Sequence, residues 1–487
     1  MTKNTRRLMR RKGRSSFMVR LTKDMHAIFF IGLGGVSMSA LAAIAHGKGY
    51  RVGGSDRVDS QILSQLRAQG IEVFIGHNAA NLDGYDTVVY NAAIPRDNPE
   101  MVRARADGLQ MIYRADFLTA LMGEHKNAIG VAGMHGKSTT SAMLSHVFLS
   151  ADRDPDILIG AQLPELNAAY RVGKTGTDFI FEACEYRDSF LSFRPTIAVV
   201  LNVEMDHPDY FKDMEQVRAS FHKYLQIPGK SGHAVINADD ENAMQCAKGI
   251  ETPVTTFSLS SPAADFYATN LHFAHGCGRC DVLHNGEHYA ALSLSVPGRH
   301  NVANALAVIA AAALCGLDGE QITRGLSTFT GAHRRMEYKG TFAPTGAAVY
   351  DDFAHHPSEI KTTLAGAKQM GYQRVFVVFQ PHTYSRTAAL LNDFRAAFSA
   401  ADQVIFTDIY AAREQNTYHI SAADIASGVP GALYLAQTQW AKITQYLAQH
   451  TTAQDMILIM GAGDIARYAE KIADKSDAKT DACVTTK

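Results

Sequence analysis

Residues 130–140 read GVAGMHGKSTT, and this stretch decides the fold of the middle of the chain. An apolar run, residues 128–132, precedes it, and a helical pattern follows from about Lys137. Glycines let a backbone curl so that successive N–H groups face a phosphate, and a helix N-terminus adds positive potential. A lysine and a hydroxyl at this point can then reach phosphate oxygens and magnesium. The stretch therefore predicts a phosphate loop, although Val131 stands where the usual spacing has glycine.

Acidic residues follow the next two predicted strands of the same unit. The strand at 178–182 runs into FEACEYR (181–187), and the strand at 196–203 contains the start of NVEMDHP (202–208). The carboxyl ends of parallel strands meet at one edge of a sheet, so these groups converge on the phosphate loop. Each acid alone reads as a helix cap or an ion-pair partner, and a histidine is an unusual ligand for Mg²⁺, which prefers oxygen. Together they favour a nucleotide–metal site.

The order of a short apolar strand, a polar or Gly-rich turn and a helical pattern occurs three times along the chain. The first unit starts at 27–31, passes GLGG (32–35) and enters a helix near Met38, with strands at 51–52 and 86–90. The third begins after Gly331, with strands at 347–352, 374–380, 403–409 and 455–460. This alternation predicts an α/β protein with parallel sheets flanked by helices. We expect domains at 25–122, 123–330 and 331–473, a basic disordered extension at 1–24 and a polar tail at 474–487.

Composition excludes several classes of protein. The 487 residues hold 47 Lys and Arg against 48 Asp and Glu, which gives nucleic-acid or membrane-surface binding no support. No run approaches the roughly 18 apolar residues of a membrane span. Six scattered cysteines make no disulfide framework, and the single C-x-x-C at Cys277 and Cys280 lacks the second pair that a structural zinc site usually needs. We therefore expect a cytoplasmic protein.

Four motifs in this order resemble the Mur ligase family over about residues 25–470. They are GMHGKST (133–139), NVEMDH (202–207), GRHNVANA (298–305) and YDDFAHHP (350–357). The resemblance implies a three-domain fold with an N-terminal Rossmann-like UDP-binding domain, a central P-loop ATPase-like domain and a C-terminal Rossmann-like domain. IGLGGVSMS (31–39) and FQPHTYSRT (379–387) resemble the branch of the family that adds L-alanine.

The resemblance also implies roles for individual residues. The catalytic groups would be Lys137, Glu182, His207, His355, His382 and Arg386, the last two beside the incoming amino acid. The residues that hold ATP would be Gly133, His135, Gly136, Lys137, Ser138, Thr139, Asn301, Asn304, Arg335 and Asp351. The ligands of Mg²⁺ would be Ser138, Glu182 and His207. The UDP-sugar would be held by Gly32, Gly34, Gly35, Asp56 and His77.

Two positions differ from patterns within the family. Several branches carry a carbamate-modified lysine where this sequence has Phe221, with Lys223 two residues on. The alanine-adding branch is similar to this chain in lacking that lysine. Thr383 stands where other members of that branch have arginine, which leaves the contacts to the amino acid open.

The resemblance implies that ATP and Mg²⁺ activate the lactoyl carboxylate of UDP-N-acetylmuramate as an acyl phosphate, which the amine of L-alanine then attacks. His355, His356 and His382 are the candidates for the base that deprotonates the amine. Three alternatives stay open at this stage: a recycling ligase that adds a tripeptide to the same sugar, a nucleotide-binding homologue without catalysis, and an NAD(P) oxidoreductase. The last rests on residues 28–56 alone, where Ser37 occupies the third glycine position of the dinucleotide fingerprint.

Overall fold

The computed structural model describes residues 25–474, apart from 92, 124, 208, 209 and 413. The predicted basic extension and residues 475–487 of the predicted tail lie outside the described residues. The chain separates into two compact units, Met1–Glu124 and His125–Lys487. Within residues 25–474, none of the helices has both the length and the apolar character needed to span a bilayer.

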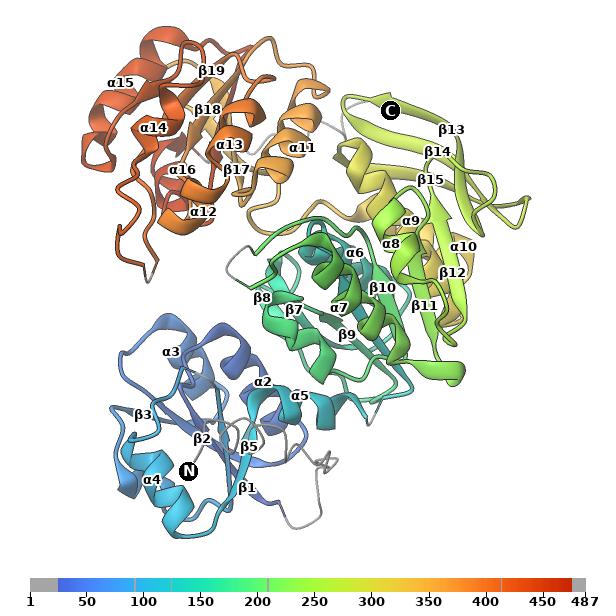
Figure 1. Ribbon diagram of the computed structural model, residues 1–487, viewed down its shortest axis with the longest axis vertical. Coiled ribbons are helices and arrows are strands. Elements are labelled where there is room, and N and C mark those ends of the chain that lie inside the picture. The colour runs from blue at the N-terminus through green and yellow to red at the C-terminus, as the bar shows by residue number, and fades with distance from the viewer. Residues whose placement is uncertain (1–24, 92, 124, 208–209, 413, 475–487) are drawn as a thin grey trace, which may run out of the picture. The chain divides into compact units, whose positions relative to one another are not determined.

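The first unit is a five-stranded parallel sheet in the order β3-β2-β1-β4-β5, flanked by helices (Figure 1). Its central strand is buried along its whole length. Phe29 joins the apolar cluster of Met101 on one face, while the ring of Phe30 lies 5.5 Å from that of Phe117 on the other. Successive strand side chains point to opposite faces, so helices must cover both sides of this sheet. The elements are β1 (Ala27–Ile31), α2 (Val36–Gly47), β2 (Arg51–Asp56), α3 (Gln61–Ala68), β3 (Glu72–Ile75), β4 (Thr87–Tyr90), α4 (Pro99–Ala106), β5 (Gln110–Tyr113) and α5 (Arg114–Met122).

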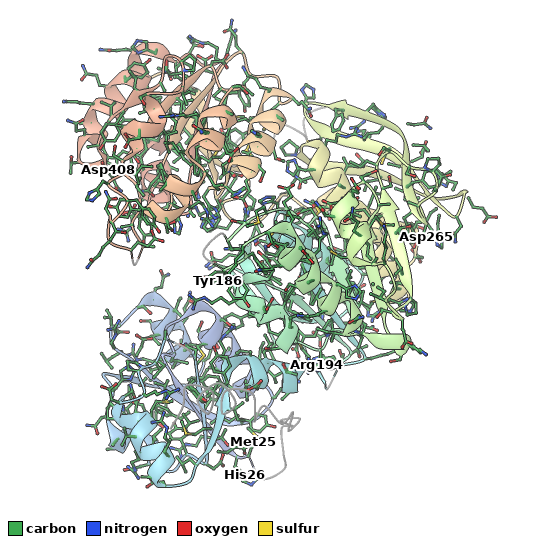
Figure 2. The ribbon with its side chains drawn as sticks, in the orientation of Figure 1. Met25, His26, Tyr186, Arg194, Asp265 and Asp408 are labelled. Carbon is green, nitrogen blue, oxygen red and sulfur yellow. The ribbon has the colours of Figure 1, made fainter. Side chains whose placement is uncertain are left out.

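The second unit contains two sheets, and the first of them has ten strands in the order β15-β14-β13-β12-β11-β10-β6-β9-β7-β8. The strand with the phosphate loop, β6, lies between β10 and β9, and all three are parallel. Strands β13, β14 and β15, which the sequence analysis did not predict, form an antiparallel meander beside the parallel strands. Asp265, labelled in Figure 2, ties this meander to β12 by accepting hydrogen bonds from the amide and hydroxyl of Thr256.

The strands of this sheet are β6 (Asn127–Ala132), β7 (Asp156–Leu163), β8 (Ala168–Arg171), β9 (Asp178–Glu182), β10 (Ile197–Val200), β11 (His233–Asn237), β12 (Val254–Ser258), β13 (Phe266–Ala274), β14 (Cys277–His284) and β15 (Glu287–Pro297). Its helices are α6 (Lys137–Ser150), α7 (Met214–Gln226), α8 (Glu241–Cys246), α9 (Arg299–Leu314) and α10 (Gly319–Thr328). The core between sheet and helices is built around α6 and α9, most of whose residues are buried.

The other sheet has seven strands in the order β20-β19-β18-β21-β17-β16-β22, in which β16 runs antiparallel to both of its neighbours, β17 and β22. Separate apolar clusters fill its two faces. Its strands are β16 (Glu337–Phe342), β17 (Ala347–Asp352), β18 (Val375–Phe379), β19 (Gln403–Phe406), β20 (Leu433–Tyr434), β21 (Met456–Met460) and β22 (Ala473–Asp474). Its helices are α11 (Pro357–Lys368), α12 (Tyr384–Ala389), α13 (Leu391–Ala397), α14 (Ala422–Ala426), α15 (Trp440–His450) and α16 (Ala466–Ile472).

Strands β9 and β17 have the bounds that the sequence predicts, whereas β10 and β19 end before the predicted residues 203 and 409. At both ends the chain leaves the sheet and turns into loops that carry polar groups. These loops lie at the carboxyl edge of parallel strands, where open α/β sheets bind ligands.

Candidate functional site

The loop between β6 and α6 has the curled backbone that its glycines predict. Gly133 and Gly136 both adopt positive φ, at 145° and 83°. A Cβ at Gly136 would lie only 2.9 Å from Oδ1 of Asn304, so a side chain there would displace that neighbour. The amide side chain of Asn202 fixes the loop, because it accepts from the backbone N–H of His135 and donates to its carbonyl.

Lys137 is folded back onto the loop. Its Nζ donates to the carbonyl oxygens of Gly133 (2.6 Å) and Met134 (3.1 Å), and it lies 3.0 Å from a carboxylate oxygen of Glu185. Burial alone would lower the pKa of Lys137, but the charge of Glu185 raises it above its ordinary value. The lysine is therefore cationic, and a phosphate that binds in this loop must replace these three partners.

Two of the predicted metal ligands are in contact. The hydroxyl of Ser138 donates to Oε2 of Glu182 at 2.7 Å, and the same oxygen accepts from the backbone N–H of Gly160 at 3.0 Å. Oxygen ligands at this separation fit Mg²⁺, with water completing the coordination. Among the described residues no cluster of three or more His, Cys, Asp or Glu side chains is arranged to hold a metal ion, so a cation here would rest on hydroxyl, carboxylate and substrate oxygens.

The third predicted ligand, His207, contacts Glu185 and Asp206. Its Nε2 is 3.3 Å from Oε1 of Glu185 and 3.8 Å from Asp206, and its ring is 4.8 Å from that of Tyr186. Tyr186, labelled in Figure 2, begins a turn in which Arg187 and Asp188 both have positive φ. Glu185, whose side chain is 1% exposed, thus links Lys137 to His207.

A cavity of about 540 Å³ opens beside the phosphate loop. Asn301 and Asn304, joined by a 3.1 Å hydrogen bond, form part of its wall on α9. Its other walls combine apolar side chains, such as Phe329, with charged ones, such as Glu337. The remaining predicted ATP residues that line the cavity are His135, Gly136, Thr139 and Arg335. A cavity of this size with a few convergent polar groups is typical of small-molecule sites.

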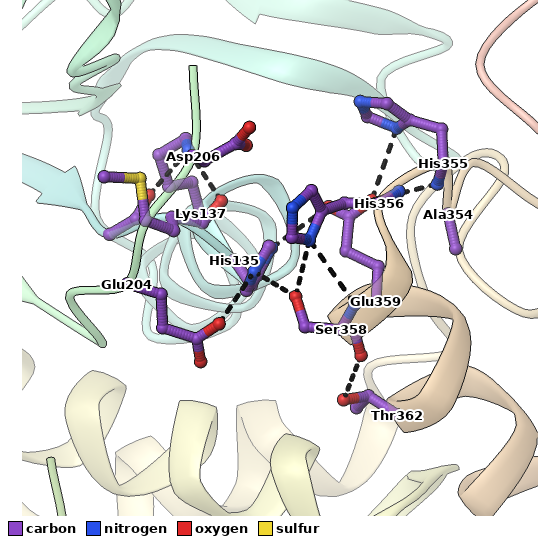
Figure 3. Close-up of polar contacts among 12 residues, drawn as sticks. His135, Lys137, Glu204, Asp206, Ala354, His355, His356, Ser358, Glu359 and Thr362 are labelled. Carbon is purple, nitrogen blue, oxygen red and sulfur yellow. Dashed lines mark hydrogen bonds and ion pairs between the residues drawn. The ribbon is translucent and has the colours of Figure 1, made fainter. Parts of the chain in front are cut away.

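The phosphate loop is bound to α11 of the other sheet through His135 (Figure 3). The Nε2 of His135 lies 2.6 Å from the hydroxyl of Ser358 and 3.5 Å from Glu204, and its Nδ1 lies 3.4 Å from Glu359. Burial works against protonation of this ring, yet the hydrogen bonds to the two carboxylates raise the pKa of His135 to about 9. The ring is therefore a charged link between two segments more than two hundred residues apart.

Arg335 and Asp351 are placed differently from each other. Arg335 reaches the phosphate loop, with Nη2 3.4 Å from the hydroxyl of Ser138. Asp351 is 1% exposed and accepts from Nε of Arg334, outside the cavity wall. Its neighbour Asp352 lines the cavity instead, and burial raises the pKa of that carboxyl to about 6. Adjacent strand residues face opposite sides of a sheet, so only one of the pair can face the nucleotide loop.

The residues predicted beside the amino acid lie near the same place. Nη2 of Arg386 is 3.8 Å from Asp206, and the rings of His355 and His382 are 5.7 Å apart. Burial lowers the pKa of His355 and of His382 to about 4, so both rings are neutral at neutral pH. Nδ1 of His355 must donate to the carbonyl of Phe353, 3.0 Å away, and this leaves Nε2 as the accepting nitrogen.

His356, the other candidate base, caps α11 through Ser358 and Glu359. Phe221 is fully buried, with its ring 5.2 Å from that of Phe190, so the position of the family lysine is part of the core of the sheet. Lys223 is exposed on the same helix.

The predicted UDP-sugar residues are gathered in the first unit. Gly32 has φ 83°, and the N–H of Gly34 donates to Asp56 at 2.9 Å, with so little room that a Cβ would lie 3.0 Å from that carboxylate. Gly35 directly precedes α2. His77 is hydrogen-bonded to Glu100, which is fully buried and also accepts from Ser55.

Sequence reasoning missed several groups of these sites. They are Glu100, Glu185, Glu204, Asp352, Ser358 and Glu359. Glu185 and Glu204 stand inside quoted motifs, so their position at strand ends was the available signal. No local signal marks Glu100, whose partner His77 lies 23 positions away. Glu359 belongs to the capping box of α11, where it accepts from the backbone N–H groups of His355 and His356, but that local pattern does not indicate its contact with His135.

Models of one family match three successive parts of the chain. They are the Mur ligase family catalytic domain at residues 27–126, the Mur ligase middle domain at 131–312 and the Mur ligase glutamate ligase domain at 334–463. The chain belongs to the Mur ligase family, whose members are ATP-dependent ligases with this three-domain α/β fold.

Named relatives place it within that family. The chain is 42% identical over 454 residues to the UDP-N-acetylmuramate–L-alanine ligase of Clostridium perfringens, covering 92% of this chain and 98% of that one. It is 44% identical over 445 residues to the ligase of that name from Clostridium novyi, covering 91% and 96%. The solved UDP-N-acetylmuramate–alanine ligase of Thermotoga maritima matches with a TM-score of 0.74 at 28% identity, covering 92% and 98%. A murein peptide ligase from Psychrobacter arcticus matches with a TM-score of 0.66 at 25% identity, covering 92% and 100%.

Proposed function

We propose that this chain joins L-alanine to the lactoyl carboxylate of UDP-N-acetylmuramate, with ATP and Mg²⁺, in the cytoplasmic synthesis of peptidoglycan precursors. The names of relatives at 41–44% identity over more than nine-tenths of the chain support this substrate pair. One structural observation carries the proposal. Arg386, the expected partner of the amino-acid carboxylate, reaches Asp206, the neighbour of His207 on the nucleotide side. The amine and the phosphoryl group would therefore meet in one place.

The first chemical step is attack of the lactoyl carboxylate on the γ-phosphorus of ATP, which forms an acyl phosphate as the bond to the β-phosphate breaks and ADP leaves. A free carboxylate is a poor electrophile, so it must be activated as an acyl phosphate before an amide can form. Lys137 would leave Glu185 and the loop carbonyls and donate to the γ-phosphate oxygens, where charge develops. Ser138 and Glu182, with His207, would hold Mg²⁺, which supplies further positive charge when bound. Arg335, 3.4 Å from Ser138, would add a guanidinium on the same side.

The second step is attack of the neutral amine of L-alanine on the acyl carbon, after which phosphate leaves. Arg386 would orient the carboxylate of the amino acid, because a guanidinium binds a carboxylate through two parallel hydrogen bonds. Of the three candidate bases, His355 has the clearest accepting nitrogen, and its pKa of about 4 keeps that nitrogen free of a proton at neutral pH. His356 is engaged in capping α11, which leaves it less free to accept a proton.

In the cavity, Asn301, Asn304, His135, Gly136 and Thr139 would surround the nucleoside and first phosphate. Asp351 would act through Arg334 rather than on the nucleotide directly. In the first unit, Gly32, Gly34 and Gly35 would hold the UDP pyrophosphate, with Asp56 and His77 next to the uridine.

The test is release of phosphate from ATP and Mg²⁺ with UDP-N-acetylmuramate, comparing L-alanine, a tripeptide and no amine. Lys137→Ala is the variant expected to be inactive. Its matched control is Lys223→Ala, which removes an exposed lysine of α7, a helix that packs on the same sheet. Release that requires both the sugar and L-alanine, is lost in the first variant and is retained in the second supports the proposal. Release with the tripeptide alone would assign the chain to the recycling branch. No release with any amine would leave a nucleotide-binding protein without ligase activity.

A further inference from the structure

The loops that follow β18 and β19 are joined at the carboxyl edge of the third sheet. The backbone N–H of Thr383 donates to the carbonyl of Tyr410, and the N–H of Tyr410 donates to that of Pro381. This bridge places the ring of His382 on that of Tyr410, with centroids 5.6 Å apart and planes 23° from parallel. The loop with His382 and Arg386 therefore takes its shape from the loop after β19.

Glu414 makes the other link between these two loops. One of its carboxylate oxygens accepts from the backbone N–H of Ser385 at 2.9 Å, and the other accepts from the Ser385 hydroxyl at 2.5 Å. Ser385 is the second residue of α12, and the next residue is Arg386. Hydrogen bonds to an ionised acceptor are short and about twice as strong as neutral ones, so this pair anchors the start of the helix that carries the arginine.

The segment that Glu414 anchors is strained. Thr383 has φ 67° and ψ 143°, a conformation that β-branched residues avoid because the side chain crowds the backbone. Such a residue persists only where its surroundings hold it. Here the holding contacts are the backbone bond to Tyr410, the bond from the Thr387 hydroxyl to the Thr383 carbonyl, and the Glu414–Ser385 pair two residues on.

The strained residue and its anchored segment lie next to His382 and Arg386, the two side chains assigned to the amino acid. The guanidinium of Arg386 points to Asp206, and His382 lies between the rings of His355 and Tyr410. If Glu414 is removed, the start of α12 loses both bonds and the strained residue before it can relax. The arginine would then lose the position from which it reaches the nucleotide side.

We propose that Glu414 is a positioning residue for the amino-acid substrate. It acts through Ser385 to hold Arg386 and His382 where they would bind the carboxylate of the incoming amino acid, and its own carboxylate accepts hydrogen bonds from Ser385. This inference rests on the proposed ligase function and names a residue that sets the affinity for the amine donor.

The experiment measures kcat and the KM values for L-alanine, ATP and UDP-N-acetylmuramate in four variants of the full chain. We expect Glu414→Ala to raise the KM for L-alanine about tenfold, the cost of a lost charged hydrogen-bond pair, with the other two KM values within twofold. Glu414→Gln retains one acceptor and should raise it less. Ser385→Ala is a milder change that tests the same link if Glu414→Ala does not fold. The variant that combines Glu414→Ala with Ser385→Ala should have the same KM for L-alanine as Glu414→Ala alone, because both changes remove the same interaction.

Asp424, on helix α14 of the same seven-stranded sheet, offers a matched control. One oxygen of its carboxylate accepts from both the backbone N–H and the hydroxyl of Ser421 at the start of α14, so it too joins a carboxylate to a serine at a helix start. Asp424→Ala should cost similar stability and leave the KM for L-alanine unchanged. Equal effects of the two alanine variants, or a change in all three KM values with Glu414→Ala, would overturn the inference. A wild-type chain without alanine-dependent phosphate release would overturn the proposed function itself and the inference with it.

Discussion

The charged link between the phosphate loop and α11 gives a prediction that can be worked from the structure. The ring of His135 lies between the carboxylates of Glu204 and Glu359, with the ring of His356 5.3 Å away. The side chain of Glu359 is 16% exposed and that of Glu204 48%. Water screens an exposed charge, so we attribute the larger part of the stabilisation of the protonated His135 ring to Glu359. The perturbation is Glu359→Gln, which removes the charge and keeps the shape.

The magnitude follows from the pKa of His135. An unperturbed histidine has a pKa of about 6.5, and His135 has a pKa of about 9. At roughly 1.4 kcal/mol per unit, the protonated ring contributes on the order of 3 kcal/mol, shared between two carboxylates. We expect Glu359→Gln to lower the pKa by about one unit. Because the folded-state pKa is raised, this stability is fully present below about pH 6.5 and is lost as the pH rises through about 9.

The assay is a proton NMR titration of ring-labelled histidine between pH 5 and 10, with the His135 signal assigned from His135→Gln. The matched control is Glu165→Gln, which removes the carboxylate 2.8 Å from Nδ1 of His146 and should leave the His135 midpoint unchanged. A second readout is the thermal midpoint, which should fall more steeply from pH 7 to 9 in the wild type than in Glu359→Gln. If His135 titrates near 6.5 in the wild-type chain, or if its midpoint does not move in Glu359→Gln, the reasoning is refuted.

Three further predictions concern the metal group, the strained turn and the core. Ser138→Ala removes one proposed oxygen ligand of Mg²⁺ and should raise the Mg²⁺ concentration for half-maximal phosphate release about tenfold, whereas Ser150→Ala at the far end of α6 should not. Arg187→Gly should raise the free energy of unfolding by roughly 0.5–1 kcal/mol, since φ 54° suits glycine, and should lower kcat because the turn holds Glu185. Asp152→Gly relieves a similar φ of 55° at a remote site, so a matching loss of kcat there would count against the second half of that prediction. Ile309→Ala, in the fully buried middle of α9, should cost about 2–5 kcal/mol in denaturant unfolding, and a loss below 1 kcal/mol would contradict the packing described here.

Strands that are buried on both faces were predictable from their own residues. β9 and β17 are buried along almost their whole length, and their bounds follow from the sequence. The meander β13–β15 was missed because its strands are only half buried, and their mixed side chains make no continuous apolar run. An antiparallel sheet with one face in water leaves a weaker signal than a parallel strand covered on both faces.

The phosphate loop is a local structure, and the contact between Ser138 and Glu182, 44 positions apart, was expected only because both lie at the carboxyl ends of parallel strands of one sheet. A glycine-rich turn between a strand and a helix points its N–H groups one way whatever surrounds it, and acids that follow parallel strands come to the same edge. The choice between Asp351 and Asp352 was not predictable in this way. Alternation says that the two face opposite sides, but which side holds the nucleotide loop depends on how the sheets pack.

By itself, the sequence determined the α/β class, the threefold strand–turn–helix pattern and the phosphate loop, because these rest on periodicity and on residues within about ten positions of each other; the family followed from four motifs that resemble it. The tertiary structure alone decided that Glu359 reaches His135, that Glu185 joins Lys137 to His207, and that Glu414 anchors Ser385. These contacts join residues from 22 to 224 positions apart, and hydrogen bonds act over about 3 Å. Only the packing of sheets and helices brings such side chains within that distance, and no local pattern encodes it.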